Sequence, residues 1–257
     1  MLFGSARRGA PALLRAFFLM ALACACAAPR PADVIVSESE PMVVVASCRL
    51  PEFMPWYTRF ASHAWIDLRD ANGVWQRVEV VGAPEAIFVR EISDEEALAS
   101  ERWERRVRVH TSLRGVDAVQ VAERVLHLAD SCEDYGQLVF ELQESGGFSG
   151  KHEAPVGRSY RQWPGPNSNT FIAWVIERTP GLSAELDHNG VGKDYPDGFR
   201  LGRTSAGWGV EIETPLLGAG IGLSQGVELH LLGLTAGVDV WPPAIKLPFL
   251  PRLGFGY

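Results

Sequence analysis

The sequence predicts a single α+β domain in which a small antiparallel sheet packs against a helix and a β-rich part follows. Three observations support this fold class. Residues 63–81 alternate as two strands around a turn, and a capped apolar segment begins near Ser168. Short alternating strands then recur from about residue 208 onward. We expect the domain to span residues 42–257.

The first 28 residues are typical of a secretory signal peptide. Three arginines precede a short apolar segment, which is followed by small residues and is too short to span a membrane. Two processing routes are open: ordinary cleavage after Ala25-Cys26-Ala27, or lipidation of Cys24, which follows the lipobox-like Ala21-Leu22-Ala23. Either route predicts a periplasmic or envelope-associated protein, and residues 29–41 then form a polar linker.

The charge of the chain argues against nucleic acid as a partner. Without the signal peptide, 21 basic and 31 acidic residues remain, which gives a formal net charge of −10. An acidic surface repels nucleic acid and anionic lipid. We therefore expect contact with a membrane only through an N-terminal lipid anchor.

Cysteine and histidine spacing predicts neither a metal site nor a cofactor. Cys48 and Cys132 remain after signal removal, and they either pair in an oxidising compartment or stay as two buried thiols. The segment Gly190–Asp194 lacks the earlier glycine and the final Ser or Thr of a phosphate-binding loop.

The clearest local prediction is a β-hairpin. A short buried strand at 42–46 and a loop precede it. Residues 63–68 form its first strand and residues 74–81 its second, because Arg69–Gly73 contains Asp, Asn and Gly, which tolerate left-handed backbone. The hairpin places a histidine, His63, on one strand and a carboxylate on the other.

Two further helices are expected between the hairpin and the central helix. Ser93 and Glu96 have the spacing of a capping box, which predicts a helix running toward Trp103. Residues 116–129 carry apolar side chains at helical spacing, and residues 144–158 are typical of a loop.

The central helix is predicted to begin near Ser168 and to end at Pro180-Gly181. Residues 163–166 form a stiff loop before it, since proline fixes φ. Asn167 and Ser168 are both good N-caps. The helix start would place the Ser168 hydroxyl where a nucleophile or an anion is stabilised.

The C-terminal part is predicted to be rich in strands. From Trp208 onward, apolar residues alternate with polar ones, as in Val210–Glu213 and Val227–Leu231, and glycines and prolines separate the short segments. We expect these strands to pack on the first sheet.

Two motifs carry a resemblance to a bacterial family known as a domain of unknown function. They are WPGPNSNTF at residues 163–171 and GKDY at residues 192–195. The resemblance extends over most of residues 45–250 and includes His63-Ala64-Trp65 and Arg77–Val80. It implies membership of a family without implying an activity.

A more distant resemblance is to circularly permuted papain-like enzymes of the NlpC and lecithin:retinol acyltransferase kind. In those enzymes a histidine begins one hairpin strand, a polar residue lies on the next, and Asn-Cys-x-x-Phe later begins a helix. Here His63, Glu79 and Asn167-Ser168 follow the same order, with serine in place of cysteine. The resemblance implies a permuted papain-like core in which Ser168 is the nucleophile, His63 the base and Glu79 the orienting carboxylate.

Four neighbouring residues are candidate binding residues: Asn167, Asn169, Trp163 and Lys193. Structural roles also account for single candidates: Asn167 and Ser168 as helix caps, and Lys193 in an ion pair or a turn. His63 would then be a hydrogen-bonded strand residue, and Glu79 an exposed strand carboxylate or a partner of Arg77.

The sequence therefore leaves three functions open. One is a cell-envelope hydrolase or acyltransferase acting on peptidoglycan peptides or lipids. The second is a non-catalytic envelope protein that binds a cell-wall peptide or lipid in the same cleft, and the third is a purely structural lipoprotein.

Overall fold

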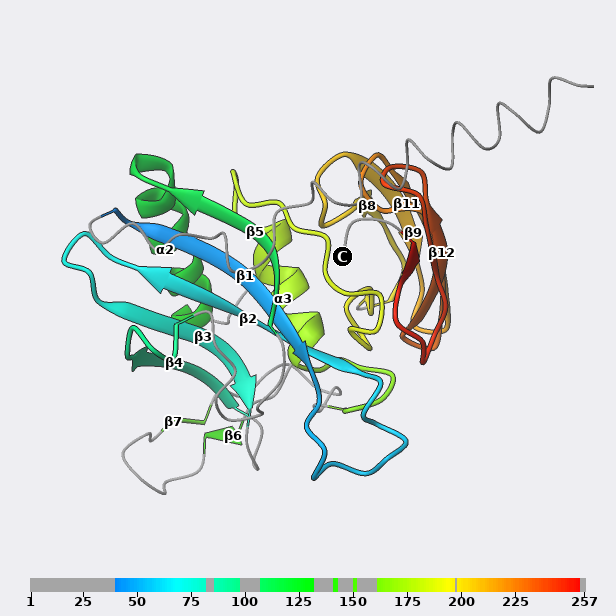
Figure 1. Cartoon of the computed structure of the whole chain (residues 1–257), viewed down its shortest axis with the longest axis horizontal. Helices are drawn as coiled ribbons and strands as arrows, with labels where there is room; N and C mark the ends of the chain where they lie inside the picture. The colour runs from blue at the N-terminus through cyan, green and yellow to red at the C-terminus, as the bar shows by residue number, and fades with distance from the viewer. Residues whose placement is uncertain are drawn as a thin grey trace, which may run out of the picture.

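The computed structural model describes residues 40–81, 86–97, 107–131, 141–142, 150–151, 161–196 and 198–254. The predicted signal peptide, Cys132 and residues 98–103 of the helix expected toward Trp103 lie outside these residues, and residues 94–97 form a turn. Two antiparallel sheets dominate the described chain, and Figure 1 shows helix α3 between them. No helix in this part of the chain is long and apolar enough to cross a membrane.

The first sheet contains the predicted hairpin. Its order is β4-β3-β2-β1-β5, and every neighbouring pair is antiparallel. The strands are β1 (Met42–Arg49), β2 (Ser62–Arg69), β3 (Trp75–Val81), β4 (Ala86–Ile92) and β5 (Arg108–Arg114). The turn between β2 and β3 is held by Asp70 Oδ1, which accepts hydrogen bonds from the N–H groups of Asn72 and Val74. Gly73 adopts φ +87° there, which glycine does without steric cost.

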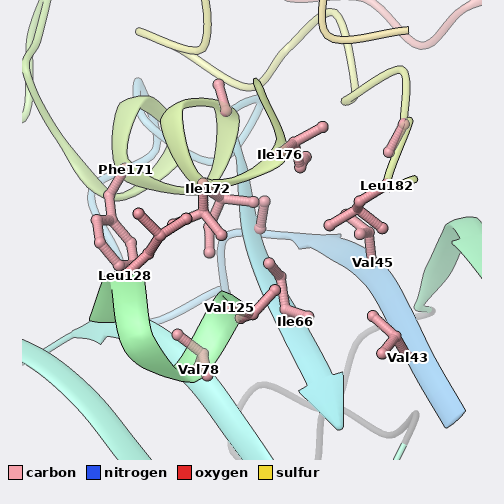
Figure 2. Close-up of a cluster of buried hydrophobic side chains, with 14 of the residues drawn as sticks. Val43, Val45, Ile66, Val78, Val125, Leu128, Phe171, Ile172, Ile176 and Leu182 are labelled. Atoms are coloured by element: carbon pink, nitrogen blue, oxygen red, sulfur yellow. The ribbon is translucent and has the colours of Figure 1, made fainter. Parts of the chain in front are cut away.

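Two helices, α2 (Val116–Ser131) and α3 (Ser168–Glu177), cover one face of the first sheet. Figure 2 shows Ile66 and Val78 of the sheet packed against Val125 and Leu128 of α2 and Ile172 of α3. The opposite face is also buried, by a second cluster that includes Trp65 and Trp75. Burial on both faces explains why β1 reads as a continuous apolar segment.

Helix α3 is buried around nearly its whole circumference, so packing rather than amphipathicity defines it. Its N-cap is Asn167, whose Oδ1 accepts from the N–H groups of Asn169 and Thr170. Thr170 Oγ1 accepts in return from the Asn167 N–H, which completes a capping box. The helix ends before Pro180-Gly181, as predicted.

The second sheet has seven strands in the order β14-β13-β12-β11-β10-β9-β8. They are β8 (Arg200–Arg203), β9 (Gly209–Glu213), β10 (Leu217–Gly222), β11 (Gly226–Leu231), β12 (Leu234–Asp239), β13 (Ala244–Lys246) and β14 (Leu253–Gly254). Strand β8 begins earlier than the predicted start of the β-rich part. A two-stranded sheet of β6 (Glu141–Leu142) and β7 (Gly150–Lys151) completes the described elements.

The expectation that the C-terminal strands pack on the first sheet is wrong. The second sheet instead contacts the segment that follows α3: Gly192 N–H donates to Gly233 O at 3.0 Å, and Lys246 Nζ lies 2.6 Å from Glu185 Oε1. Phe249 also meets Phe60, from the loop before β2. The fold is therefore mixed α+β with a strong β content, and α3 with its following segment separates the two sheets (Figure 1).

Candidate functional site

The structure brings Ser168, His63 and Glu79 into one hydrogen-bonded row. His63 Nδ1 lies 3.2 Å from Ser168 Oγ, and His63 Nε2 lies 3.2 Å from Glu79 Oε2. All three side chains are buried, with 8% of Ser168 and 5% each of His63 and Glu79 exposed. Three residues separated by up to 105 positions thus form the arrangement expected of a nucleophile, a base and an orienting group.

Glu79 is held in its charged form. Burial by itself would raise the pKa of Glu79, but the hydrogen bond from His63 and the charges of His63, Arg77 and Arg90 outweigh it and lower the pKa. A carboxylate accepts hydrogen bonds and donates none, so His63 Nε2 must carry the proton that it shares with Glu79. In the neutral ring, Nδ1 is then free of a proton and accepts from the Ser168 O–H.

Arg77, which lies on the same strand as Glu79, forms an ion pair with another acid. Arg77 Nε donates to Asp67 Oδ1 at 2.7 Å, and its guanidinium stacks over Trp65. The cation beside Glu79 is Arg90 of β4, with Nε 3.6 Å from Oε1. Sequence reasoning missed Arg90. It lies on β4, which pairs with the strand of Glu79, and no strand was expected from the sequence at these residues.

The start of α3 is fixed by the side chain of Asn169. The β2–β3 pairing extends from Arg69↔Trp75 to Ile66↔Val78 and no further toward the start of β2. Beyond it, Asn169 Oδ1 accepts from the Ala64 N–H at 3.0 Å, and its Nδ2 donates to Ser62 O at 2.9 Å. The carboxamide thus occupies the position that a neighbouring strand would take, and this places Ser168 beside His63.

Asn167, rather than Ser168, caps the helix. The Asn167 Nδ2 also donates to Val191 O at 2.9 Å and to Gln162 O at 3.3 Å. Since this capping leaves the Ser168 hydroxyl to His63, the cap explanation of Ser168 does not hold. Gly192 is needed for the same packing: a Cβ there would lie 2.5 Å from Asn167 Nδ2, and its φ is +83°.

The remaining candidate binding residues differ in exposure. Trp163, in the loop before α3, is 45% exposed. Asn167 and Asn169 are each 4% exposed, and the contacts above engage their polar atoms within the protein. A ligand contact by any of these residues stays a prediction.

Lys193 belongs to a buried charge cluster at the second sheet. Its Nζ lies 2.6 Å from Asp194 Oδ2 and 3.1 Å from Glu228 Oε2. His230 contacts both of those acids and places Nδ1 2.6 Å from Glu213 Oε1. Burial would lower the pKa of His230, but these three carboxylates outweigh it and raise its pKa to about 10.

The same cluster contains three side chains with metal-ligating atoms, from Asp194, Glu228 and His230, all within 4.8 Å of one another. The ammonium group of Lys193 lies against two of them and supplies the positive charge that a cation would provide. The cluster thus serves to join the segment after α3 to the second sheet.

The fold and the site together define an α+β protein with a buried Ser–His–Glu arrangement at a helix start. A family model described as "Protein of unknown function (DUF3750)" matches residues 43–195, and the chain belongs to this family. The matched range contains His63, Glu79 and Ser168 and ends before β8. Comparisons with curated proteins and with solved structures find no match.

Proposed function

We propose that this chain is a cell-envelope hydrolase or acyltransferase that acts on amide or ester bonds of peptidoglycan peptides or lipids. The observation that carries the proposal is the position of the His63 ring, with Ser168 Oγ at 3.2 Å on one side and Glu79 Oε2 at 3.2 Å on the other. The proposal further includes a permuted papain-like core. Its support is the chain order: strand histidine, carboxylate on the hairpin partner, then nucleophile at a later helix start.

The chemistry follows from the groups present. Ser168 Oγ attacks the substrate carbonyl carbon while its proton passes to His63 Nδ1. The charge that develops on the carbonyl oxygen is favoured by the positive end of α3. His63 then returns the proton to the departing amine or alcohol, which leaves an acyl-serine. Water or a second alcohol or amine releases the acyl group in the reverse sequence.

One backbone group is suited to the developing oxyanion. Four N–H groups at a helix start have no partner within the helix. In α3, three of them are engaged: that of Asn167 by Thr170 Oγ1, and those of Asn169 and Thr170 by the Asn167 side chain. The described part of the chain offers no acceptor to the fourth, the Ser168 N–H.

The test is covalent labelling by a fluorophosphonate, which reacts with serines activated by a base. We expect labelling at Ser168, loss of labelling in Ser168→Ala, and a fall of about 100-fold or more in the labelling rate of His63→Gln. Ser205→Ala, which changes a partly exposed serine in the connection between β8 and β9, is the matched control and should label normally. Equal labelling of Ser168→Ala and the unchanged protein would exclude Ser168 as the nucleophile.

A second variant tests whether His63 acts as a base at position 168, independently of any activity on a substrate. In Ser168→Cys, the thiol would lie beside the same His63 nitrogen, which favours the thiolate. We expect its alkylation by iodoacetamide at pH 6 to be at least about tenfold faster than in the variant that also carries His63→Gln. Equal rates would mean that His63 does not act as a base toward this position.

The burial of Ser168 and His63 limits the access of a substrate carbonyl to the serine hydroxyl. This favours a second function, in which the protein binds a cell-wall peptide or lipid at this site without reacting with it. In that case peptidoglycan fragments bind the folded protein and are recovered unchanged, and Ser168→Ala binds them as well as the unchanged protein. Turnover of the fragments by the unchanged protein but not by Ser168→Ala would select the first function.

A further inference from the structure

The second sheet is inverted relative to the usual arrangement of a sheet in a water-soluble protein, because its apolar side chains point outward. In β11, Val227, Leu229 and Leu231 are exposed while Glu228 and His230 are buried. The neighbouring strands follow the same register, so that the outward residues form continuous rows across the sheet. The outward aliphatic residues with at least 42% exposure are Leu201, Val210, Ile212, Leu217, Ile221, Val227, Leu229, Leu231, Val238, Ile245 and Leu253.

The inward side of this sheet fixes the inversion. Lys246 Nζ lies 2.7 Å from Glu228 Oε1 and 2.6 Å from Asp239 Oδ1. Glycines leave room for inward carboxylates of the neighbouring strands. A Cβ at Gly218, for example, would lie 1.6 Å from Glu213 Oε2. The charged side chains find their partners, and the room that the glycines leave, only on the inward side of the sheet. The aliphatic rows therefore face outward.

The connections at one end of the sheet extend this apolar surface. Residues 204–208, 223–225 and 240–243 join β8 to β9, β10 to β11 and β12 to β13, and they contain no Asp, Glu, Lys or Arg. Four of their side chains are large and apolar, with exposed fractions of 68–76%. They are Trp208, Leu223, Val240 and Trp241. We call these connections the tips, and the tips together with the outward rows the apolar face.

The area of the apolar face leaves two kinds of occupant open, a lipid surface and a second copy of the chain. Seven strands about 4.8 Å apart and roughly 17 Å long give the rows an area on the order of 500 Å². This is a large patch for a monomer. A second copy, whose stable interface buries about 800 Å² of accessible surface on each partner, therefore has to be distinguished from lipid by the chemistry of the face.

The chemistry of the apolar face matches lipid. Its outward strand positions carry aliphatic side chains, apart from Arg203 on the edge strand β8. Tryptophans at the tips suit the boundary between headgroups and acyl chains, where aromatic side chains are enriched. The absence of basic side chains at the tips means that the attraction does not require anionic lipid.

From these observations we propose that the second sheet docks on the surface of a lipid bilayer, with the apolar face against the hydrocarbon and Trp208 and Trp241 inserted at the headgroup level. The docking holds the Ser168 site close to the membrane. It does not depend on whether Ser168 reacts, because the apolar face is formed by other residues.

The test measures partition of the full chain onto vesicles of zwitterionic phosphatidylcholine. Every protein carries Cys24→Ala, so that no acyl chain at that residue contributes. We expect Ile212→Lys with Leu229→Lys, at the centre of the apolar face, to lower the partition coefficient at least about tenfold. Val116→Lys with Val119→Lys is the matched control, since it changes two exposed valines on α2, and it should bind within about twofold of the unchanged protein.

A second readout locates the contact. Phosphatidylcholine with brominated acyl chains should quench part of the tryptophan fluorescence, and Trp208→Phe with Trp241→Phe should remove that part. If the variant with both lysines does not fold, the variant with both phenylalanines takes its place in the partition measurement. Binding that is unchanged by both variants would overturn the proposal. A second result would also overturn it. If the unchanged protein does not bind vesicles but forms a dimer in sedimentation equilibrium, and if the variant with both lysines is monomeric, then a second copy covers the apolar face.

Discussion

Replacement of Asn169 by alanine tests the claim that one side chain fixes the start of α3. The Asn169 carboxamide makes three buried hydrogen bonds, to the Ala64 N–H, to Ser62 O and to Val191 O. Val191 O keeps the Asn167 Nδ2 as a donor, so two backbone groups of β2 lose a partner. Each buried group left unpaired costs about 1–3 kcal/mol, whereas alanine gains about 0.5 kcal/mol in helix propensity.

The expected loss is therefore about 3 kcal/mol of unfolding free energy. For a chain of this length, it corresponds to a fall of about 6–12 °C in Tm. Urea denaturation at constant m-value and thermal unfolding provide the measurement. Hydrogen exchange should also become faster at the Ala64 N–H, which has lost its acceptor.

Asn72→Ala is the matched control, because Asn72 lies exposed in the turn between β2 and β3. Its loss should stay within about 0.5 kcal/mol. A loss below about 1 kcal/mol for Asn169→Ala would refute the reasoning, since it would mean that water or another side chain readily replaces the carboxamide.

Two further predictions concern the second sheet. Gly218→Ala should destabilise the protein by about 2 kcal/mol or more, because the new Cβ would meet the Glu213 carboxylate at 1.6 Å. Gly202→Ala in the same sheet has its nearest atom at 4.0 Å and should be nearly neutral in the same denaturation assay; equal losses would contradict the close fit. The pKa of His230 is raised to about 10 in the folded protein, so its stabilisation is complete below about pH 6.5 and is lost as the pH rises toward 10. Denaturation between pH 6.5 and 10 should show a steeper decline for the unchanged protein than for His230→Gln, with the exposed His127→Gln as the control, and parallel declines in all three would contradict this sign.

Local sequence signals were sufficient for several elements of the fold. The hairpin from residue 63 to 81 follows from alternation around Asp70–Gly73, and the helix after Asn167 follows from its cap and its apolar residues. Such signals involve neighbours a few positions apart, and both elements are confirmed. The candidate row of His63, Glu79 and Ser168 was implied by the resemblance to permuted papain-like enzymes, which share this chain order, and not by a local signal.

Tertiary structure decided what local signals leave open. Alternation in Val227–Leu231 predicts a strand whichever face is buried. Buried ion pairs, among them those of Lys193 and Lys246 with Glu228, turn the polar face inward. Likewise, both Asn167 and Ser168 could cap α3, and the capping box of Asn167 leaves the Ser168 hydroxyl for His63. The sequence by itself thus determined the elements and the candidate residues. Contacts between distant segments determined which face of the second sheet is exposed and which groups form the site, because such contacts depend on packing rather than on spacing along the chain.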